Sequence, residues 1–426
     1  MRTKFLFPIF ISLLTISLFV GATVAETIQE TRCFSFYNFT GDYFSSVWIN
    51  KYKYNAGDTL AGGVLLKNIN DYPMPDMKVK AYVFYVGDTF TDRLEGNDMI
   101  DEMWIAEDVN LMPGQTYNIE FTWQIPTQSK SGFYLVTFYL LTSNQFNLGG
   151  LSFFPEIPGK STFFEISNDN GGLMFFDKNN VTVNDNPYKF RSNVGPFEFP
   201  LTVKDKLTNL GSEAKVDVVY DLYAWDDSSE KNKIDEKTES FDLGSGESKD
   251  IVYSFPNDLD NQVYQLSIKA VAKDGRTSMI KIRLPMDTQK GRFIFLGLQD
   301  FPLVGGESNK ILWCFSNSAY SSYEGKQTVE ILDKSGKVLE SYEFDPVTMS
   351  GTVDGASQPF SPKEPLYYVK VVGKIFDKDN NLQQQVEVVY DATKFGLEVP
   401  SFNYYLVLIP VVIAAAIALI WHWRRR

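Results

Sequence analysis

The sequence contains a single histidine, His422, which stands close to the end of the 426-residue chain. Without a second histidine, the remainder cannot assemble a Ser-His-Asp triad, a Cys-His pair or a histidine-bearing zinc or copper site. The sequence therefore predicts that the protein is not an enzyme, with no catalytic, cofactor-binding or metal-binding residue. A carboxylate-based hydrolase stays open as a remote alternative, because two carboxylates suffice to cleave glycosides.

Cysteine is almost as scarce, since Cys33 and Cys314 are the only two in the chain. Two cysteines cannot staple several domains, so the fold is not a disulfide scaffold. Cys314 lies inside the apolar segment 311–315 and is expected to be a buried strand residue. A disulfide between Cys33 and Cys314 stays open as the alternative.

Basic residues are outnumbered, with 40 lysines and arginines against 53 aspartates and glutamates and a formal net charge of −13. A strongly acidic surface repels the phosphate backbone, so nucleic acid is excluded as a partner. Solubility at a cell surface, cation binding and a basic partner all stay open.

The N-terminal residues have the composition of an export signal. Arg2 and Lys4 precede an apolar stretch over residues 5–20, and small residues follow up to Ala25. This order predicts a secretory signal peptide over residues 1–25, with an uncleaved N-terminal anchor as the alternative.

The C-terminal residues predict a membrane anchor. The run from Tyr404 to Trp421 carries no charge, and its 18 residues would span roughly 27 Å as a helix. We therefore expect a transmembrane helix over residues 404–423, after a linker at 394–403. The basic residues that follow favour the cytoplasmic side; they are Arg424, Arg425 and Arg426. The expected topology is a single-pass protein in the cell membrane, with an extracellular ectodomain and a cytoplasmic C-terminus.

Between these ends the chain is rich in β-strand patterns. Apolar residues alternate with more polar ones over 77–85 and again over 215–225, which predicts half-buried strands. Asp274-Gly275 between two apolar runs predicts a hairpin. No long helical period is present, so the predicted fold class is all-β, with tandem Ig-like β-sandwich domains and one C-terminal transmembrane helix. The predicted domains are an N-terminal extension at 26–44 and three sandwiches at 45–168, 173–286 and 290–393.

Three further patterns concern possible sites. Asn38 and Asn180 each begin an N-glycosylation sequon, so the protein is a candidate glycoprotein. Asp377 begins a segment that resembles a calcium loop, but Leu382 replaces the glycine of the sixth position, so a hairpin turn is expected and structural calcium is the minor alternative. Paired phenylalanines are expected to pack in cores, with a carbohydrate-binding face as the alternative; the pairs are Phe153-Phe154, Phe163-Phe164 and Phe175-Phe176.

A family resemblance is carried by four short segments. The segment 52–60 ahead of 64–68, and the later segments 207–211 and 243–247, resemble the cell-adhesion-related (CARDB-type) Ig-like domains of archaeal and bacterial surface proteins. Ala56 departs from the proline that is usual there. The resemblance implies a β-sandwich fold at a cell surface and implies no catalytic residue. The tail also resembles an archaeosortase-type sorting signal, in which Pro400 and Phe402 would form the short motif before the span.

Together these patterns predict a membrane-anchored cell-surface protein with a structural or adhesion role, S-layer-like or envelope-associated. The expected partners are the membrane and cell-surface proteins or glycans. The alternative is a receptor or accessory subunit of a membrane complex that binds glycans or protein.

Overall fold

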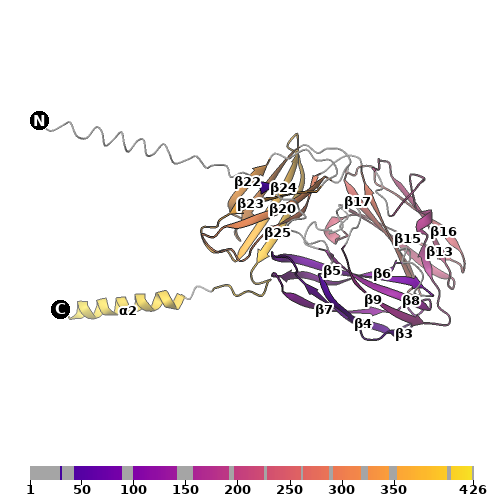
Figure 1. Cartoon of the computed structure of the whole chain (residues 1–426), viewed down its shortest axis with the longest axis horizontal. Coiled ribbons are helices and arrows are strands. Elements are labelled where there is room, and N and C mark those ends of the chain that lie inside the picture. The colour runs from indigo at the N-terminus through magenta and orange to yellow at the C-terminus, as the bar shows by residue number, and fades with distance from the viewer. Residues whose placement is uncertain are drawn as a thin grey trace.

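The chain is described by a computed structural model (Figure 1). It covers residues 29–30, 43–88, 99–141, 157–190, 196–224, 228–260, 262–286, 291–317, 325–344, 353–400 and 404–424. The predicted signal peptide lies outside the described residues, as do Cys33, Asn38, Phe402, Arg425, Arg426 and the pair Phe153-Phe154.

The described residues form five β-sheets, which confirms the all-β prediction. One sheet runs, in order, through β15 (Lys233–Leu243), β14 (Ala214–Ala224), β17 (Val263–Ala272), β18 (Thr277–Pro285), β6 (Met99–Leu111), β5 (Met74–Gly87), β8 (Gly132–Leu141), β9 (Ile157–Ser167) and β3 (Lys53–Asn55). A second contains β2 (Phe44–Ile49), β4 (Thr59–Lys67) and β7 (Thr116–Gln124). A third contains β10 (Met174–Phe176), β13 (Thr202–Asn209), β11 (Thr182–Val183) and β12 (Asn186–Pro187), with β16 (Ser248–Ser254) paired to β13.

The last two sheets form the third part of the chain. One contains β1 (Gln29–Glu30), β23 (Val353–Phe360), β20 (Asn309–Asn317) and β19 (Gly291–Leu298). The other contains β22 (Val338–Phe344), β21 (Gly325–Leu332), β24 (Tyr368–Asp377) and β25 (Leu382–Asp391). The described helices are two short 3-10 turns, η2 (Lys178–Asn180) and η3 (Glu230–Asn232), and α2 (Tyr404–Trp423).

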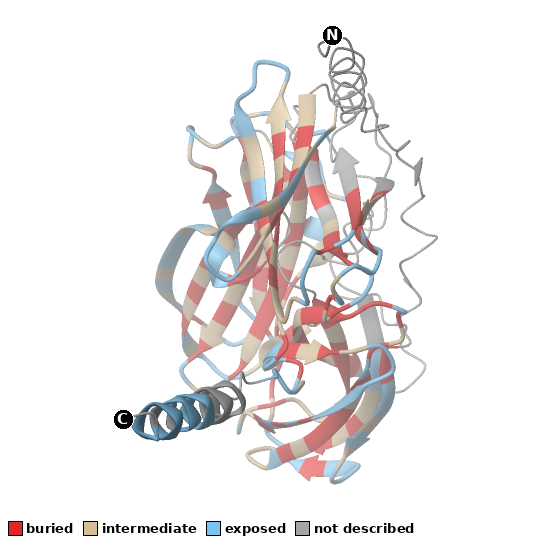
Figure 2. Cartoon of the chain, turned by 90° about the vertical axis from the view of Figure 1, so that its left-hand side faces the viewer, coloured by how far each residue is buried: buried red, intermediate tan, exposed pale blue. Residues whose placement is uncertain are grey.

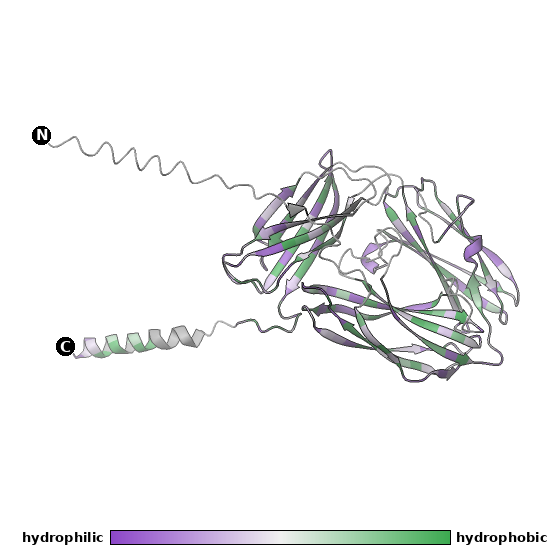
Figure 3. Cartoon of the chain, in the orientation of Figure 1, coloured by the Kyte–Doolittle hydropathy of each residue, from purple (hydrophilic) through white to green (hydrophobic). Residues whose placement is uncertain are grey.

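Sheets pack face to face around three hydrophobic cores, and we name the surrounding parts the first unit (β2–β9), second unit (β10–β18) and third unit (β19–β25). The units lie around a triangle in Figure 1. Along their strands, apolar and polar residues alternate, as Figure 3 shows in green and purple. The bounds predicted for three separate domains stay predictions.

One sheet crosses from the first unit into the second. β6 pairs antiparallel with β18 at a single position, Met99 opposite Met279. Unit one also touches unit three, because Leu312 and Cys314 of β20 belong to the first core. The units are therefore joined through sheet and core contacts and not by linkers alone.

Burial along β5 differs from the half-buried strand that its alternation predicts. Val79, Ala81 and Val83 are buried as expected, but Lys80 and Tyr82 on the opposite face are buried as well. The physical reason is that the second unit covers that face, since Lys80 contacts Ser228 and Tyr82 contacts Lys281. Figure 2 shows buried positions along many strands of the molecule.

Helix α2 has the bounds expected for the C-terminal span, and it stands apart from the sheets in both views (Figures 1 and 2). Among the described residues, no helix qualifies as a candidate membrane span. Cys314 is fully buried, as predicted, and it is also disulfide-bonded, which the sequence left open.

Candidate functional site at the junction of the first two units

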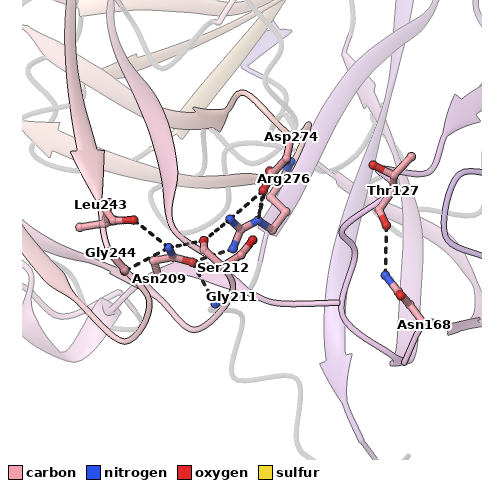
Figure 4. Close-up of polar contacts among 9 residues, drawn as sticks. All are labelled: Thr127, Asn168, Asn209, Gly211, Ser212, Leu243, Gly244, Asp274 and Arg276. Atoms are coloured by element: carbon pink, nitrogen blue, oxygen red, sulfur yellow. Dashed lines mark hydrogen bonds and ion pairs between the residues drawn. The ribbon is translucent and has the colours of Figure 1, made fainter. Parts of the chain in front are cut away.

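Arg276 lies beside the junction, at the end of the predicted hairpin turn between β17 and β18. Its side chain is only 3% exposed and forms a salt bridge of 2.8 Å with Asp274. The guanidinium also donates to Asn209 Oδ1 at 2.6 Å and to the carbonyl of Ser212 at 2.7 Å (Figure 4). A planar group with several fixed donors suits this set of acceptors better than a lysine would. Arg276 therefore ties the hairpin to the end of β13.

Asn209, which accepts from the Arg276 guanidinium, also donates hydrogen bonds of its own. We call Arg276, Asp274 and Asn209 the Arg276 node. Its Nδ2 donates to the carbonyls of Ser212, Leu243 and Gly244 at 2.8, 3.0 and 3.2 Å. A buried amide with this many partners fixes the conformation of the turn that follows β15.

Asn68 occupies the equivalent place in the first unit. Its Nδ2 donates to the carbonyls of Tyr72 and Leu111, and its main chain pairs with Gln115 and Gly114. Asn209 pairs with Glu247 and Gly246 in the same way. The first and second units therefore share the same hydrogen-bond pattern at this turn.

The connection between the units packs directly on Arg276. A Cβ atom added to Gly172 of the connection would lie 3.4 Å from Arg276 Nη1 and 2.2 Å from the Cα of Gly211, and one added to Gly211 in the β13–β14 turn would lie 1.9 Å from Arg276 Nη1. Only glycine allows so close an approach. On the first-unit side, Asn168 Nδ2 donates to the carbonyls of Thr127 and Ser129 (Figure 4). The connection is thus held at both ends.

A second set of contacts lies where β6 meets β18. Glu102 lies 3.2 Å from the ammonium of Lys80 and 2.7 Å from that of Lys281. Lys80 is 2% exposed, donates to Ser228 Oγ at 2.8 Å and lies 4.1 Å from the ring centroid of Trp104. We call Lys80, Glu102 and Lys281 the seam cluster.

Electrostatics favours the charged form of the seam cluster. Burial alone would raise the pKa of Glu102, but the ammonium groups of Lys281 and Lys80 outweigh it and hold that pKa at about 2. Next to it, Asp101 pairs with Lys269 at 2.7 Å and accepts from Trp123 Nε1 at 3.1 Å. Charged side chains from both units therefore reinforce the single Met99–Met279 bridge.

Three described carboxyl groups, Asp76, Asp205 and Asp221, have pKa values raised chiefly by burial. Burial, followed by a hydrogen bond to Asp108, raises the pKa of Asp76 to about 6. Asp205 faces the second core at 3% exposure with an unpartnered Oδ2, and burial raises its pKa to about 7. Asp108 is exposed, so the Asp76–Asp108 pair is not the buried pair in a cleft that a glycosidase would need. Among the described residues, no group of three or more His, Cys, Asp or Glu could hold a metal ion.

The remaining predicted sites lie apart from the junction. Asn180 is exposed on η2 and donates to Asp177 Oδ2 at 2.7 Å. Asp377 closes the β24–β25 hairpin by accepting from the main-chain N–H groups of Asp379 and Asn381, which confirms the predicted turn. Pro400 and Arg424 are exposed, before and after α2.

Two of the three phenylalanine pairs lie in the described residues, and three of their four side chains pack as expected. Phe164 and Phe176 are fully buried in the first and second cores, and Phe175 packs against the first core. Phe163 is half-buried.

The sequence analysis did not predict the junction residues. Because a lysine on a strand is ordinarily exposed, nothing in the sequence indicated that Lys80 is buried. Asn68 and Asn209 each stand at the end of a strand in a segment that carried the family resemblance, and this position is the signal that could have found them.

Comparisons with known proteins add little. The chain matches no protein-family model and no curated protein. It is similar to trypsin-activated alpha-2-macroglobulin from Escherichia coli, with 11% identity and a TM-score of 0.35 over 83% of this chain and 24% of that one. It is also similar to dimeric latent PorU from Porphyromonas gingivalis, with 10% identity and a TM-score of 0.21 over 82% and 33%. The chain thus spans about a quarter of the macroglobulin's length, and these distant likenesses carry no argument about function.

Proposed function

We propose that the protein is a membrane-anchored component of the cell surface with a structural or adhesion role and no catalytic activity. The observation that carries the proposal is the outward-facing apolar surface of α2. Val412, Ile413 and Ile417 are each more than half exposed on this helix, well away from the three cores. Exposed apolar side chains on this scale call for an apolar partner, and a bilayer would supply one.

The ectodomain suits a load-bearing or spacing role. The seam cluster joins the first two units, and Leu312 and Cys314 of the third unit pack in the first core, so the three β units would keep a fixed arrangement outside the cell. We propose that the units are Ig-like sandwiches of the CARDB type, that the signal peptide directs export, and that Arg424 to Arg426 hold the C-terminus in the cytoplasm.

Fractionation and protease shaving of intact cells test this proposal. The full chain is expected in the membrane fraction, with epitopes in the ectodomain accessible to external protease and a C-terminal tag protected. A matched chain that stops after residue 400 should leave the membrane fraction. Recovery of the full chain from the cytosol would contradict the proposal, and an intact mass ending near Pro400 would identify the tail as a sorting signal.

A glycan-binding receptor is the second candidate function. It is favoured by an exposed tryptophan, Trp48, on the outer face of the first unit.

A further inference from the structure

The outer face of the sheet β2–β4–β7 presents one aromatic side chain to solvent. Val47 and Ile49 pack against the first core, so Trp48 between them points away from it. On β7, Ile119 and Phe121 are buried in the same core, and Glu120 between them points outward. Strand register places Trp48 opposite Gly63 and Gly63 opposite Glu120. These three residues therefore form one row across the outer face.

Gly63 shapes the middle of this row. A Cβ atom added there would lie 2.7 Å from Trp48 Nε1 and 2.8 Å from Trp48 Cε2. The indole therefore lies against the backbone of β4, and any other residue at position 63 would displace it. Gly63 is buried although it faces outward, whereas Trp48 is 44% exposed. We call this indole, which packs against the sheet and leaves part of its surface open to water, the platform.

Polar side chains border the platform. Asn118 and Thr122 stand on either side of Glu120 along the same outward row of β7, and all three are exposed. Within the described part of the chain, no hydrogen bond or ion pair engages the Trp48 indole N–H, the Glu120 carboxylate or the Asn118 amide. Donors and acceptors are thus available beside an open aromatic face.

This arrangement fits the two-sided chemistry of a pyranose ring. One face of such a ring presents C–H groups that pack on an aromatic surface, while its hydroxyl groups lie at the edge and need hydrogen-bond partners. A carboxylate can accept from two hydroxyls and a side-chain amide can both donate and accept. The net charge of −13 disfavours sugars that carry carboxylate or sulfate.

We propose that the outer face of β2–β4–β7 binds an uncharged pyranose-containing glycan, with Trp48 as the stacking surface and Glu120 and Asn118 as the hydroxyl partners. The inference supplies a ligand class for the receptor alternative and rests on the proposed display of the ectodomain outside the cell. A peptide partner would instead need an apolar groove. The row of Trp48, Gly63 and Glu120 contains one aromatic ring with polar side chains around it, so it does not form such a groove.

Binding of defined oligosaccharides to the detergent-solubilised full chain tests the proposal. The probes are tetra- to hexasaccharides of glucose, mannose, galactose and N-acetylglucosamine, with polygalacturonate fragments as the acidic comparison. We expect saturable binding of at least one neutral probe, measured by calorimetry, together with a change in tryptophan fluorescence. Trp48→Ala should weaken this binding by about tenfold or more, and Glu120→Gln by a smaller factor. Gly63→Val should also weaken it, because the added side chain moves the indole.

Tyr52→Ala is the matched control, because Tyr52 is similarly exposed at 49% but lies outside the sheet. It should bind as the unmodified chain does, and thermal unfolding of each variant shows whether it is folded. The proposal is overturned if no neutral probe saturates, if only acidic probes bind, or if Trp48→Ala and Tyr52→Ala bind equally. Loss of self-association in Trp48→Ala, with no sugar bound by the unmodified chain, would assign the face to a second copy instead. Failure of binding leaves the fractionation result untouched, so the two proposals are tested separately.

Discussion

Buried polar side chains order the part of the second unit that faces the junction, and Arg276 carries the buried charge among them. Arg276→Met would leave Asp274 without its ion pair and Asn209 Oδ1 without the guanidinium. We expect the free energy of unfolding to fall by about 3 kcal/mol, measured by urea denaturation of the full chain.

Two variants sharpen this prediction. Arg276→Lys restores the charge but not the planar donor set, and it should recover less than half of the loss. Lys189→Ala, at an exposed lysine of the same unit, should change stability by less than about 0.5 kcal/mol. Equal stability of Arg276→Met and Lys189→Ala would show that the node is dispensable.

The buried Asp205 carboxyl group should make the free energy of unfolding depend on pH. Its folded-state pKa of about 7 lies above the ordinary value of 3.8, so the folded chain holds a proton that the unfolded chain releases. Stability from this group is full below about pH 4 and is lost as the pH rises through about 7. As the pH rises from 5 to 8, the free energy of unfolding of Asp205→Asn should therefore increase by about 2 kcal/mol relative to that of the unmodified chain.

Denaturation at both pH values measures this gain, and Asp250→Asn on the neighbouring strand β16 provides an exposed control. A stability difference between Asp205→Asn and the unmodified chain that does not change with pH would mean that Asp205 is ionised in the folded chain.

At the scale of elements, the β6–β18 contact depends on side chains because a single bridge position joins the two strands. Glu102→Gln would leave Lys80 and Lys281 facing each other without their shared carboxylate. We expect a loss of about 3 kcal/mol at neutral pH and faster amide exchange along β18. Because the pKa of Glu102 is lowered to about 2, its contribution is present above about pH 4.5 and declines as the pH falls toward 2.

Glu107→Gln is the matched control on the same strand, where the carboxylate makes an exposed ion pair of 2.9 Å with Lys78. Such a pair contributes roughly 0 to 1 kcal/mol. If both glutamine variants lose equally little, the seam cluster does not hold the two units together.

Individual strands could be predicted from sequence better than their assembly. The alternation over 77–85 and 215–225 located β5 and β14, because one face of each strand packs in a core whatever lies on the other. No prediction covered β6, whose segment carries four acidic residues that are uncommon in strands. Acidic side chains are stable there because lysines of both units neutralise Asp101 and Glu102. The lysine that pairs with Asp101 lies more than 160 positions away in the sequence, so no local pattern could indicate this pairing.

The candidate site was harder still to predict. Burial of Lys80 and Arg276 follows from how the units pack, and the glycine contacts at Gly172 and Gly211 follow from the path of the connection. Trp48, by contrast, lies on β2 between Val47 and Ile49, and the outward direction of its side chain follows from these two apolar neighbours, which pack against the first core. That the indole packs against the sheet could not be predicted from sequence, because it depends on Gly63 standing opposite Trp48 on β4.

At the scale of the whole molecule, the disulfide bond of Cys314 bears on how the chain is closed. Cys314 is disulfide-bonded, and the sequence has one other cysteine, Cys33, which lies outside the described residues. The described strand β1 pairs Glu30 with Ala356 of β23, and β23 in turn pairs Gly355 with Cys314. Residues just before Cys33 therefore belong to the same sheet as Cys314. The bond would close the chain from its N-terminal extension onto the third unit.

We therefore expect a non-reduced digest of the folded protein to contain one peptide that joins Cys33 to Cys314, identified by mass spectrometry. Closing a loop of this length restricts the unfolded chain and stabilises the folded one by up to about 5 kcal/mol. Reduction, or a double Cys33→Ser and Cys314→Ser variant, should lower the melting temperature to the same value. Because Cys314 is buried, the two treatments must agree if the bond itself, and not the packing of the thiol, provides the stability. Two alkylatable thiols in the unreduced, unfolded protein would contradict the pairing and leave the three units closed by the seam cluster and core contacts alone.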